Sequence, residues 1–481
     1  MLTLLTIFFL QFANKAGSEV VCLSPTAIQM RIDRGIDIDS LDYAVSPIYL
    51  DSVKALGAKV LHTSRWMNGA TIKADNKTIT AIQQCSFVDS IFYTRIDNDL
   101  FNTPSISLNK QDVDIYTGLD KLGSNGQIRQ LNLHHLHQLG FQGNGIRIGV
   151  ADGGFYNADI LPELPHEQCL GYVDLTDDRD DIFGHTGNHG SLCLTAIVGQ
   201  KLPSDTALTL TSFSGTAPQA NYFLFKTEET ATESPKEIDN WVAAIEMADS
   251  IGLHIVSTSL GYTTFDHKPF NFTYADMDGR ASRGARAASI ATRKGMLLVT
   301  AMGNEGNKSW HYLSSPADAD SILSVGAVNQ EGVIATFSSY GPTADGRTKP
   351  EVCAMGEGTC LINPADGTLI NSNGTSFACP LIAGMAASLW SALPQATNMQ
   401  IRDIIIRSCD RYHDPHEQYG YGIPNVWMAY NNALLNTQSA TIHTPHSTSR
   451  KIMHNGQLYI VYNQLVYDVL GNPVATKLLN F

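Results

Sequence analysis

Short apolar segments recur between helical segments from residue 146 onward, and this alternation constrains the fold of the 481-residue chain more than any other feature. The apolar segments are 146–150, 222–225, 255–259, 297–300 and 322–325. Such short uninterrupted runs are typical of parallel strands covered on both faces. Helices are predicted over 238–251 and 281–294, ended by Gly252 and Gly295. The pattern predicts an α/β domain of three layers with a mainly parallel sheet.

Both flanks of this region have a different pattern. Residues 18–105 predict a small α+β domain, with a helix over 49–56 and a hairpin over 59–72. The stretch 437–450 is polar and lacks apolar periodicity, so we expect a linker there. Apolar residues alternate again over 451–481, which predicts a short β module.

The first residues form an apolar run from Leu2 to Phe12, followed by the small residues Ala13, Ala16 and Gly17. The run is shorter than the roughly 20 residues that a membrane-spanning helix needs. We therefore interpret residues 1–17 as a secretion signal, with a buried strand or helix of the first domain as the alternative. We expect no integral membrane segment elsewhere in the chain.

Composition excludes two broad classes. Hydrophobic residues make up 43% of the chain and charged residues 16%, a balance that excludes a mostly disordered protein. The formal net charge is −14, which gives no general attraction for nucleic acid or anionic lipid. The eight cysteines include no Cys-x2-Cys pair for zinc, although Cys353 and Cys360 could close a small loop in an exported protein.

Four polar residues follow predicted strands or begin predicted helices. They are Asp152 in VADGG, His189 in HGS, Asn304 in AMGNEG and Ser376 in GTSFACP. Each residue alone has an ordinary structural explanation, such as a turn or a helix cap. Together they are the types required for a base-orienting carboxylate, a base, an oxyanion donor and a nucleophile.

In this order the four motifs resemble those of the subtilisin-like serine proteases, the S8 or subtilase family. The segments GTAPQANYFLFK and STSLGY also match, and the resemblance extends over residues 130–436. It implies that His189 takes the proton of Ser376, Asp152 orients His189 and Asn304 stabilises the oxyanion. The polar loop before His189 holds His185 as the alternative base. The substrate-lining residues implied by the resemblance are Ser259, Leu260, Gly261, Ala301 and Gly303.

The resemblance also implies a precursor of the exported Bacteroidetes type. Residues 18–105 resemble a propeptide whose usual first strand is absent or short, and they would act as an intramolecular inhibitor. Residues 106–436 would be the peptidase domain, acting on protein or peptide substrates as a secreted or cell-surface serine endopeptidase (EC 3.4.21). The module at 451–481 resembles C-terminal sorting tails used in outer-membrane secretion, with an ordinary β appendage as the alternative. The chemistry needs no cofactor, and the acidic run 174–181 could hold a structural calcium or be a solvated loop.

Two other functions fit parts of the sequence. One is a catalytically inactive binding protein with the subtilase fold. The other is a serine esterase, because residues 374–378 differ by one position from the Gly-x-Ser-x-Gly motif. In that fold the serine precedes its acid and base, which would come from Asp410, His413, Asp414 or His416. An esterase would leave Asp152, His189 and Asn304 without a role.

Overall fold

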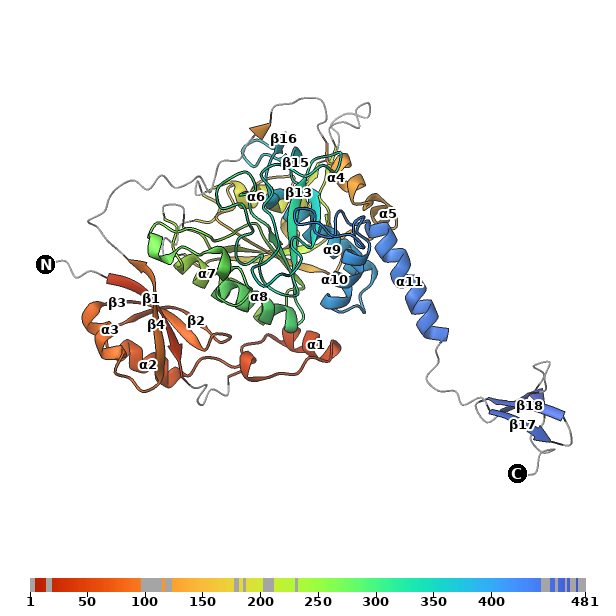
Figure 1. Ribbon diagram of the computed structural model, residues 1–481, viewed down its shortest axis with the longest axis horizontal. Coiled ribbons are helices and arrows are strands. Elements are labelled where there is room, and N and C mark those ends of the chain that lie inside the picture. Colours follow the sequence, from red (N-terminus) through yellow and green to blue (C-terminus); the bar gives the residue numbers. More distant parts are fainter. Residues whose placement is uncertain are drawn as a thin grey trace. The chain divides into compact units, whose positions relative to one another are not determined.

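The computed structural model divides into two compact units, residues 1–429 and 430–481, and each is described by itself. Figure 1 labels several elements of both units. The structure describes residues 5–13, 20–96, 115–116, 123–176, 181–184, 187–201, 212–229, 232–442, 450–454, 457–462, 465–467 and 473–474.

A seven-stranded sheet forms the centre of the first unit. Its order is β14-β13-β12-β11-β6-β10-β7, and every neighbouring pair is parallel. The strands are β6 (Arg147–Asp152), β7 (Cys169–Asp174), β10 (Asn221–Lys226), β11 (Ile255–Thr258), β12 (Leu297–Ala301), β13 (Leu323–Val328) and β14 (Val352–Met355). This arrangement confirms the predicted three-layer α/β fold.

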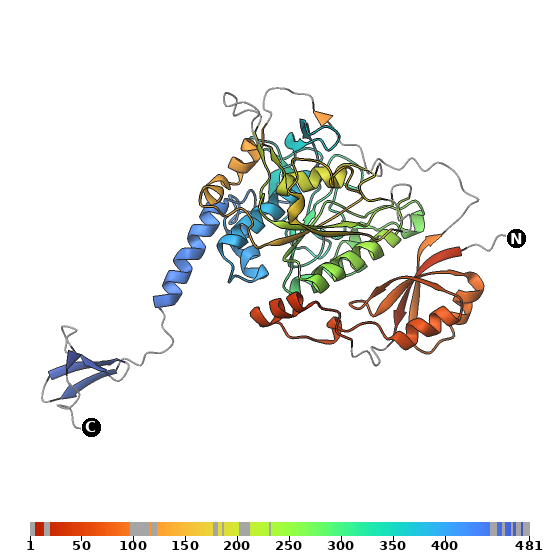
Figure 2. The same cartoon turned by 180° about the vertical axis from the view of Figure 1, so that it is seen from behind.

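Helices cover both faces of this sheet (Figures 1 and 2). Side chains alternate along β11 between the two faces of the sheet. Val256 packs in the core with helices α7 and α8. On the opposite face, Ser257 Oγ lies 3.6 Å from Cys379 Sγ of helix α9. The helices are α4 (Asn125–Gln130), α5 (His134–Gln138), α6 (His189–Val198), α7 (Lys236–Ile251), α8 (Arg283–Arg293), α9 (Thr375–Ala392) and α10 (Asn398–Arg407). Short strands outside the main sheet are β5 (Ile115–Tyr116), β8 (Gln200–Lys201), β9 (Phe213–Ser214), β15 (Thr359–Ile362) and β16 (Leu369–Ser372).

An antiparallel sheet of four strands, in the order β2-β3-β1-β4, precedes this domain. Its elements are β1 (Leu5–Phe12), α2 (Pro47–Ala55), β2 (Lys59–Ser64), β3 (Gly69–Asp75), α3 (Asn76–Ile82) and β4 (Val88–Ile96), while α1 (Pro25–Asp33) and the 3-10 helix η1 (Ser40–Asp42) lie between β1 and α2. We call residues 5–96 the N-terminal domain. The predicted boundary at residue 105 lies outside the described residues.

The interpretation of residues 1–17 as a secretion signal separate from the next domain is wrong for Leu5–Phe12. This segment is β1, an inner strand paired with both β3 and β4. It is the first strand that the propeptide resemblance lacked. The N-terminal domain therefore begins before position 18, where the sequence pattern alone puts its start.

Burial on both faces explains why β1 resembles a secretion signal. Phe8, Leu10 and Phe12 belong to the core shared with α2 and α3. Phe9 points to the other face and joins Trp66 and Met67 in the core that includes α7 and α8. A strand buried on both sides has no polar positions at a period of two, so its sequence reads as one apolar run.

The predicted linker at 437–450 is wrong in its first part. Helix α11 (Val426–Ile442) continues into that range. The segment is polar, but it holds neither Gly nor Pro before Pro445, so nothing in its composition ends the helix. In the second unit, strands β17 (Arg450–His454), β18 (Gln457–Tyr462), β19 (Leu465–Tyr467) and β20 (Pro473–Val474) form an antiparallel sheet where the sequence predicts a β module.

Two further expectations concern cysteines and membranes. All eight cysteines are free, so Cys353 and Cys360 do not form the bridge that the sequence allowed. Instead, Cys353 Sγ lies 3.5 Å from the Tyr419 carbonyl oxygen. Of the described helices, α9 has the length and apolar character to cross a membrane, and 83% of it is buried inside the protein, as in a core helix.

The packing of β1 gives a prediction for the free energy of unfolding of the four-stranded sheet. The test uses the full chain with the Ser376→Ala substitution as its background. Phe8 is fully buried, so Phe8→Ala should lower the free energy of unfolding of the four-stranded sheet by about 3–5 kcal/mol. Native-state hydrogen exchange of the β1–β4 amides measures this value. Phe92→Ala is the matched control, because Phe92 is 46% exposed, and it should change the value by about 1 kcal/mol or less. Equal effects would mean that β1 is not part of the sheet.

Candidate active site

A carboxylate and an imidazole lie together at the carboxyl end of β6. Asp152 is the last residue of β6 and His189 is the first residue of α6. His189 Nδ1 lies 2.8 Å from Asp152 Oδ1 and 3.0 Å from Oδ2. A carboxylate only accepts hydrogen bonds, so Nδ1 donates and Nε2 keeps the lone pair. This arrangement leaves Nε2 able to take a proton.

The close approach of β6 and α6 depends on Gly190. A Cβ at this position would lie 2.4 Å from the Gly154 carbonyl oxygen and 2.9 Å from Asp152 Cβ. Any larger residue would push the start of α6 away from the end of β6. Ser191 donates through Oγ to the Tyr156 carbonyl at 2.8 Å and connects the same turn to the loop after β6.

Ser376 lies in the first turn of α9, after Gly374. Gly374 has φ +152°, a conformation that favours glycine. Among the described residues, Ser376 Oγ donates to the Ser259 carbonyl at 3.3 Å rather than to His189. The neighbouring ring of Phe377 lies 5.6 Å from the His189 ring, which places the start of α9 beside the imidazole. The structure therefore brings Ser376, His189 and Asp152 into one region.

Asn304 lies beyond the carboxyl end of β12, and its amide is fixed by Thr375. Asn304 Oδ1 accepts from the Thr375 backbone N–H and from Thr375 Oγ1, both at 2.9 Å. A backbone N–H only donates, so the atom facing it must be the amide oxygen. The amide Nδ2 therefore points away from Thr375 and lies beside Gly374, where an added Cβ would be 3.7 Å from it.

The environment of His189 favours its charged form. Burial by itself lowers the pKa of His189, but the Asp152 carboxylate outweighs burial, and the net pKa lies well above the ordinary value of 6.5. Cys193 Sγ lies 3.9 Å from His189 Nδ1 and 3.4 Å from the Ser376 carbonyl oxygen. Burial raises the pKa of the Cys193 thiol, so this thiol remains neutral.

The residues predicted to line the substrate site follow β11 and β12. Ser259 Oγ donates to the Ser376 carbonyl at 2.7 Å, and the Gly303 N–H donates to Thr375 Oγ1 at 3.2 Å. Leu260 is half-buried and packs against the α7–α8 core, while Gly261 is exposed. Ala301 is the buried last residue of β12. Of these five, Ser259 and Gly303 contact the start of α9 directly.

Sequence reasoning gave no role to Thr375 or Cys193. Thr375 lies within the GTSFACP motif beside Ser376, so its position was a signal for a role at the site. Cys193 lies one helical turn after His189, which was the only indication that its side chain shares the same face of α6. The alternative base His185 lies outside the described residues.

Two clusters of described residues bring possible metal ligands within 4.8 Å of one another. The first is Asp152, His189 and Cys193, where Nδ1 already bonds the carboxylate and the thiol is protonated. The second is Glu228, Glu233 and Glu237. Glu228 accepts from the Tyr262 hydroxyl at 2.6 Å, and Glu237 accepts from the Glu229 N–H at 2.8 Å. Both carboxylates are thus engaged by the protein itself.

The acidic run considered for calcium lies only partly within the described residues. Asp174 pairs with Lys226 at 3.1 Å and accepts from the Thr176 N–H at 2.8 Å. Asp181 accepts from the Phe183 N–H at 3.0 Å. Asp177, Asp178 and Asp180 are outside the described residues, so calcium binding stays a prediction.

Comparison with known proteins matches both halves of the first unit. A model of the subtilase family matches residues 143–422, and a model of the Bacteroidota peptidase S8 propeptide domain matches residues 8–111. The thermostable alkaline protease of Halalkalibacterium halodurans is 28% identical over 62% of this chain and 71% of its own length. Subtilisin NAT of Bacillus subtilis subsp. natto is 25% identical over 79% of this chain and 85% of its own length.

A solved structure shows the same fold. MycP1 from Mycobacterium smegmatis superposes with a TM-score of 0.51 at 20% identity, covering 66% of this chain and 86% of that protein. The propeptide match begins within β1 and ends beyond β4, so the N-terminal domain is the propeptide. Since the subtilase model covers more than half of the chain, the protein belongs to the subtilase family of serine endopeptidases, which need no cofactor for catalysis.

Proposed function

We propose that this protein is an exported serine endopeptidase in which Ser376 is the nucleophile, His189 the general base, Asp152 the orienting carboxylate and Asn304 the oxyanion donor. The observation that carries the proposal is the hydrogen bond between His189 Nδ1 and Asp152, which leaves Nε2 as the base beside the helix that bears Ser376. Substrates are proteins or peptides, as the family membership and the attached propeptide support.

In the proposed mechanism the Ser376 hydroxyl leaves the Ser259 carbonyl and gives its proton to His189 Nε2. Its oxygen attacks the scissile carbonyl carbon, and the carbonyl oxygen becomes an oxyanion. Asp152 stabilises the imidazolium that forms. His189 then gives the proton to the leaving amine, and a water molecule repeats the sequence on the acyl-enzyme.

Asn304 acts on the oxyanion through its amide Nδ2. The two hydrogen bonds to Thr375 hold the amide before the substrate arrives, so little reorganisation is needed when negative charge develops. Thr375 is thus a positioning residue. Ser259, Leu260, Gly261, Ala301 and Gly303 would line the substrate at the same edge of the sheet.

The precursor would process itself and be exported. We propose that the propeptide inhibits the peptidase domain until the segment near residue 105 is cut by Ser376, because a tethered segment reacts at a high effective concentration. Export is supported by the resemblance to exported precursors and by the propeptide match. The support does not come from Leu5–Phe12, because this segment is a strand of the propeptide. A sorting role for 451–481 and a structural calcium are parts of the proposal that await a test.

Covalent labelling tests the nucleophile. A serine-directed phosphonate probe should label Ser376 in the processed protein, and Ser376→Ala should remove the label and accumulate as a precursor that keeps the propeptide. Peptide mapping and N-terminal sequencing measure both results. His189→Ala should abolish turnover and His185→Ala should retain most of it. Labelling at another serine, or equal processing of purified Ser376→Ala, would contradict the assignment or the self-processing, respectively.

The pKa of His189 gives a pH prediction. Protonated His189 cannot accept the Ser376 proton, so activity is lost as the pH falls through the pKa of this group. Because that pKa is raised, kcat/KM on a short peptide should rise with pH along a single titration whose midpoint lies above 6.5. Asp152→Asn should lower kcat by roughly 10,000-fold. A midpoint below 6.5 in the parent enzyme would contradict the proposed pairing.

Removal of the oxyanion donor should act on kcat. Asn304→Leu should reduce kcat by roughly 100- to 1000-fold with little change in KM, the size measured for loss of such a donor in a subtilisin. Thr375→Val removes the hydroxyl that orients the amide and should have a smaller effect in the same direction, while Thr375→Ser should restore activity. A main effect of Asn304→Leu on KM would argue for ground-state binding instead.

A further inference from the structure

Residues 20–44 form a closed excursion from the propeptide sheet, which we call the anchor loop. Its two ends are joined by the bridge between Val21 and Tyr43 and by hydrogen bonds from Cys22 N to Asp42 O at 2.8 Å and from Ala44 N to Val20 O at 2.9 Å. Between these ends it contains α1 and η1. The loop can therefore be shortened without breaking the connection between β1 and α2.

The anchor loop has almost no apolar core of its own. Helix α1 buries only Ala27 and Arg31, while Ile32 is 66% exposed and Ile38 is 39% exposed. The core residues shared by β1–β4, α2 and α3 include no member of the loop. A helix of nine residues is marginal by itself in water, so the conformation of the loop depends on the peptidase domain that it contacts.

The loop contacts the carboxyl-terminal ends of α7 and α8. Gly252 ends α7, and a Cβ there would lie 3.1 Å from Met30 Sδ and 3.2 Å from Ala27 Cα. Gly295 follows α8, and a Cβ there would lie 2.8 Å from Ile36 Cδ1. Both glycines have positive φ, so they end the helices and also leave room for the anchor loop.

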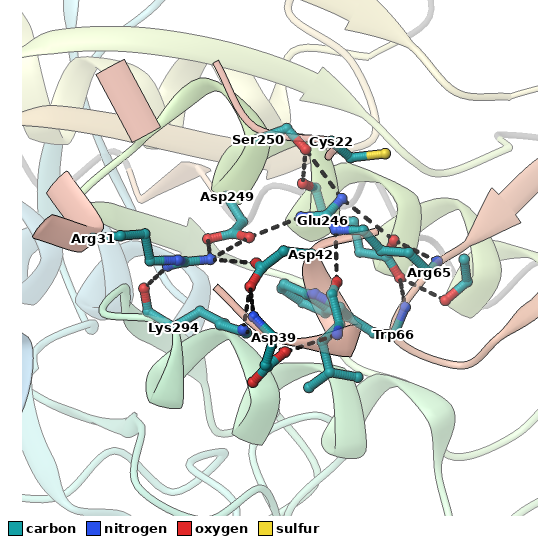
Figure 3. A network of polar contacts seen from close by, with 12 residues as sticks. Cys22, Arg31, Asp39, Asp42, Arg65, Trp66, Glu246, Asp249, Ser250 and Lys294 are labelled. Atoms are coloured by element: carbon teal, nitrogen blue, oxygen red, sulfur yellow. Dashed lines mark hydrogen bonds and ion pairs between the residues drawn. The ribbon is translucent and has the colours of Figure 1, made fainter. Parts of the chain in front are cut away.

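Two arginines of the loop meet the negative ends of these helices. Arg31 Nη2 donates to both oxygens of Asp249 in α7, at 2.7 and 2.8 Å, and Nη1 donates to the Lys294 carbonyl (Figure 3). Arg34 Nη1 donates to the Gly295 carbonyl at 2.6 Å, and its guanidinium lies 5.0 Å from the Trp390 ring centroid. Helix carboxyl ends attract cations, so these contacts fit guanidinium groups.

Additional charged contacts surround Asp249 (Figure 3). Arg65, in the turn between β2 and β3, donates to Asp249 Oδ2 at 2.8 Å. Lys294 donates to Asp42 at 2.6 Å. The side chains of Arg31, Asp42, Asp249 and Lys294 are each 6% exposed or less. Removing one partner would leave a buried charge without its counterion, which is strongly unfavourable.

The contact lies at the edge of the sheet opposite the candidate active site. Gly252 and Gly295 precede the amino ends of β11 and β12, whereas Ser259 and Asn304 follow their carboxyl ends. A strand of four or five residues spans roughly 13–17 Å. The anchor loop can thus hold the propeptide without occupying the groups that we assign to catalysis.

We propose that the ends of α7 and α8 form a second binding site of the peptidase domain, outside the active site, whose ligand is the anchor loop. The site recognises two guanidinium groups presented one helical turn apart, as in Arg31 and Arg34. It keeps the propeptide bound after the covalent link to the peptidase domain is cut. This proposal extends the precursor function proposed above. It rests on that function for the reason why the link between propeptide and peptidase domain is cut.

Dissociation of the cut propeptide tests this site. The protein is the full chain with Ser376→Ala and a recognition sequence for an added site-specific protease after residue 105. After cutting, the protein is captured on a surface and diluted, and the release of the N-terminal fragment is measured over time. Arg31→Met, Arg34→Met, and replacement of residues 23–42 by two glycines should each speed release at least roughly tenfold. Since the added protease makes the cut, the result is independent of whether the chain is itself a protease.

The matched control is Lys54→Met, because Lys54 is exposed and, among the residues that the structure describes, its ion pair is with Asp51 of its own helix. It should leave the release rate unchanged. Hydrogen exchange of the β1–β4 amides in the uncut chain confirms that each variant propeptide is folded. Asp249→Asn on the peptidase domain gives a second route. Combined with Arg31→Met, it should add less than its own single effect, and the part that remains comes from its pair with Arg65. Parent-like release from the shortened loop, or full additivity of the pair, would overturn the proposal.

Discussion

The parallel pairing of β6, β11 and β12 is the constraint on which the candidate site depends. Ala151 pairs with Thr258, and Thr258 pairs with Thr300, so the three strands end at the same level. The residues that follow these pairs, Asp152 and Ser259 among them, therefore emerge side by side at one edge. The amino ends of α6 and α9 meet this edge and add His189 and Ser376.

The same helices and strands carry the propeptide contact at the other edge. Helices α7 and α8 lead from the carboxyl edge of the central sheet to its amino edge. The core on their outer side includes Phe9, Trp66 and Met67 of the propeptide. Glu246 of α7 accepts from the backbone N–H groups of Arg65 and Trp66, at 2.9 and 3.2 Å. The propeptide is thus bound along the length of two helices rather than only near the active site.

The sequence predicts the chemistry of this protein better than the limits of its parts. Asp152, His189, Asn304 and Ser376 lie in short motifs because a fixed turn must present each side chain, and such turns leave a local signature. Thr375 was missed because its role is a hydrogen bond to a residue 71 positions away. A contact of this kind has no pattern in one sequence.

The prediction of helices and strands failed where the buried residues do not follow the spacing expected for the element. β7 was missed because Gly171 interrupts its apolar run, and as an edge strand it leaves Leu170 and Tyr172 exposed. β1 was misassigned for the opposite reason, since both of its faces are buried. Helix α1 was missed because polar contacts with distant residues, and not an apolar stripe, hold it, although Ser24 and Pro25 are a typical helix start.

The buried charges between propeptide and peptidase domain give the interface its specificity. The propeptide contributes Arg31, Arg65 and Asp42, and the peptidase domain contributes Glu246, Asp249 and Lys294. The first set carries one excess positive charge and the second one excess negative charge, so the two buried sets balance each other; the exposed Asp39 adds a further pair with Lys294 at 2.9 Å. Breaking one buried pair costs about 3–5 kcal/mol, whereas an intact pair adds little beyond what apolar contacts would give. A propeptide docked in another register would leave such charges unpaired, so the cluster selects one arrangement of the two domains and opposes their separation.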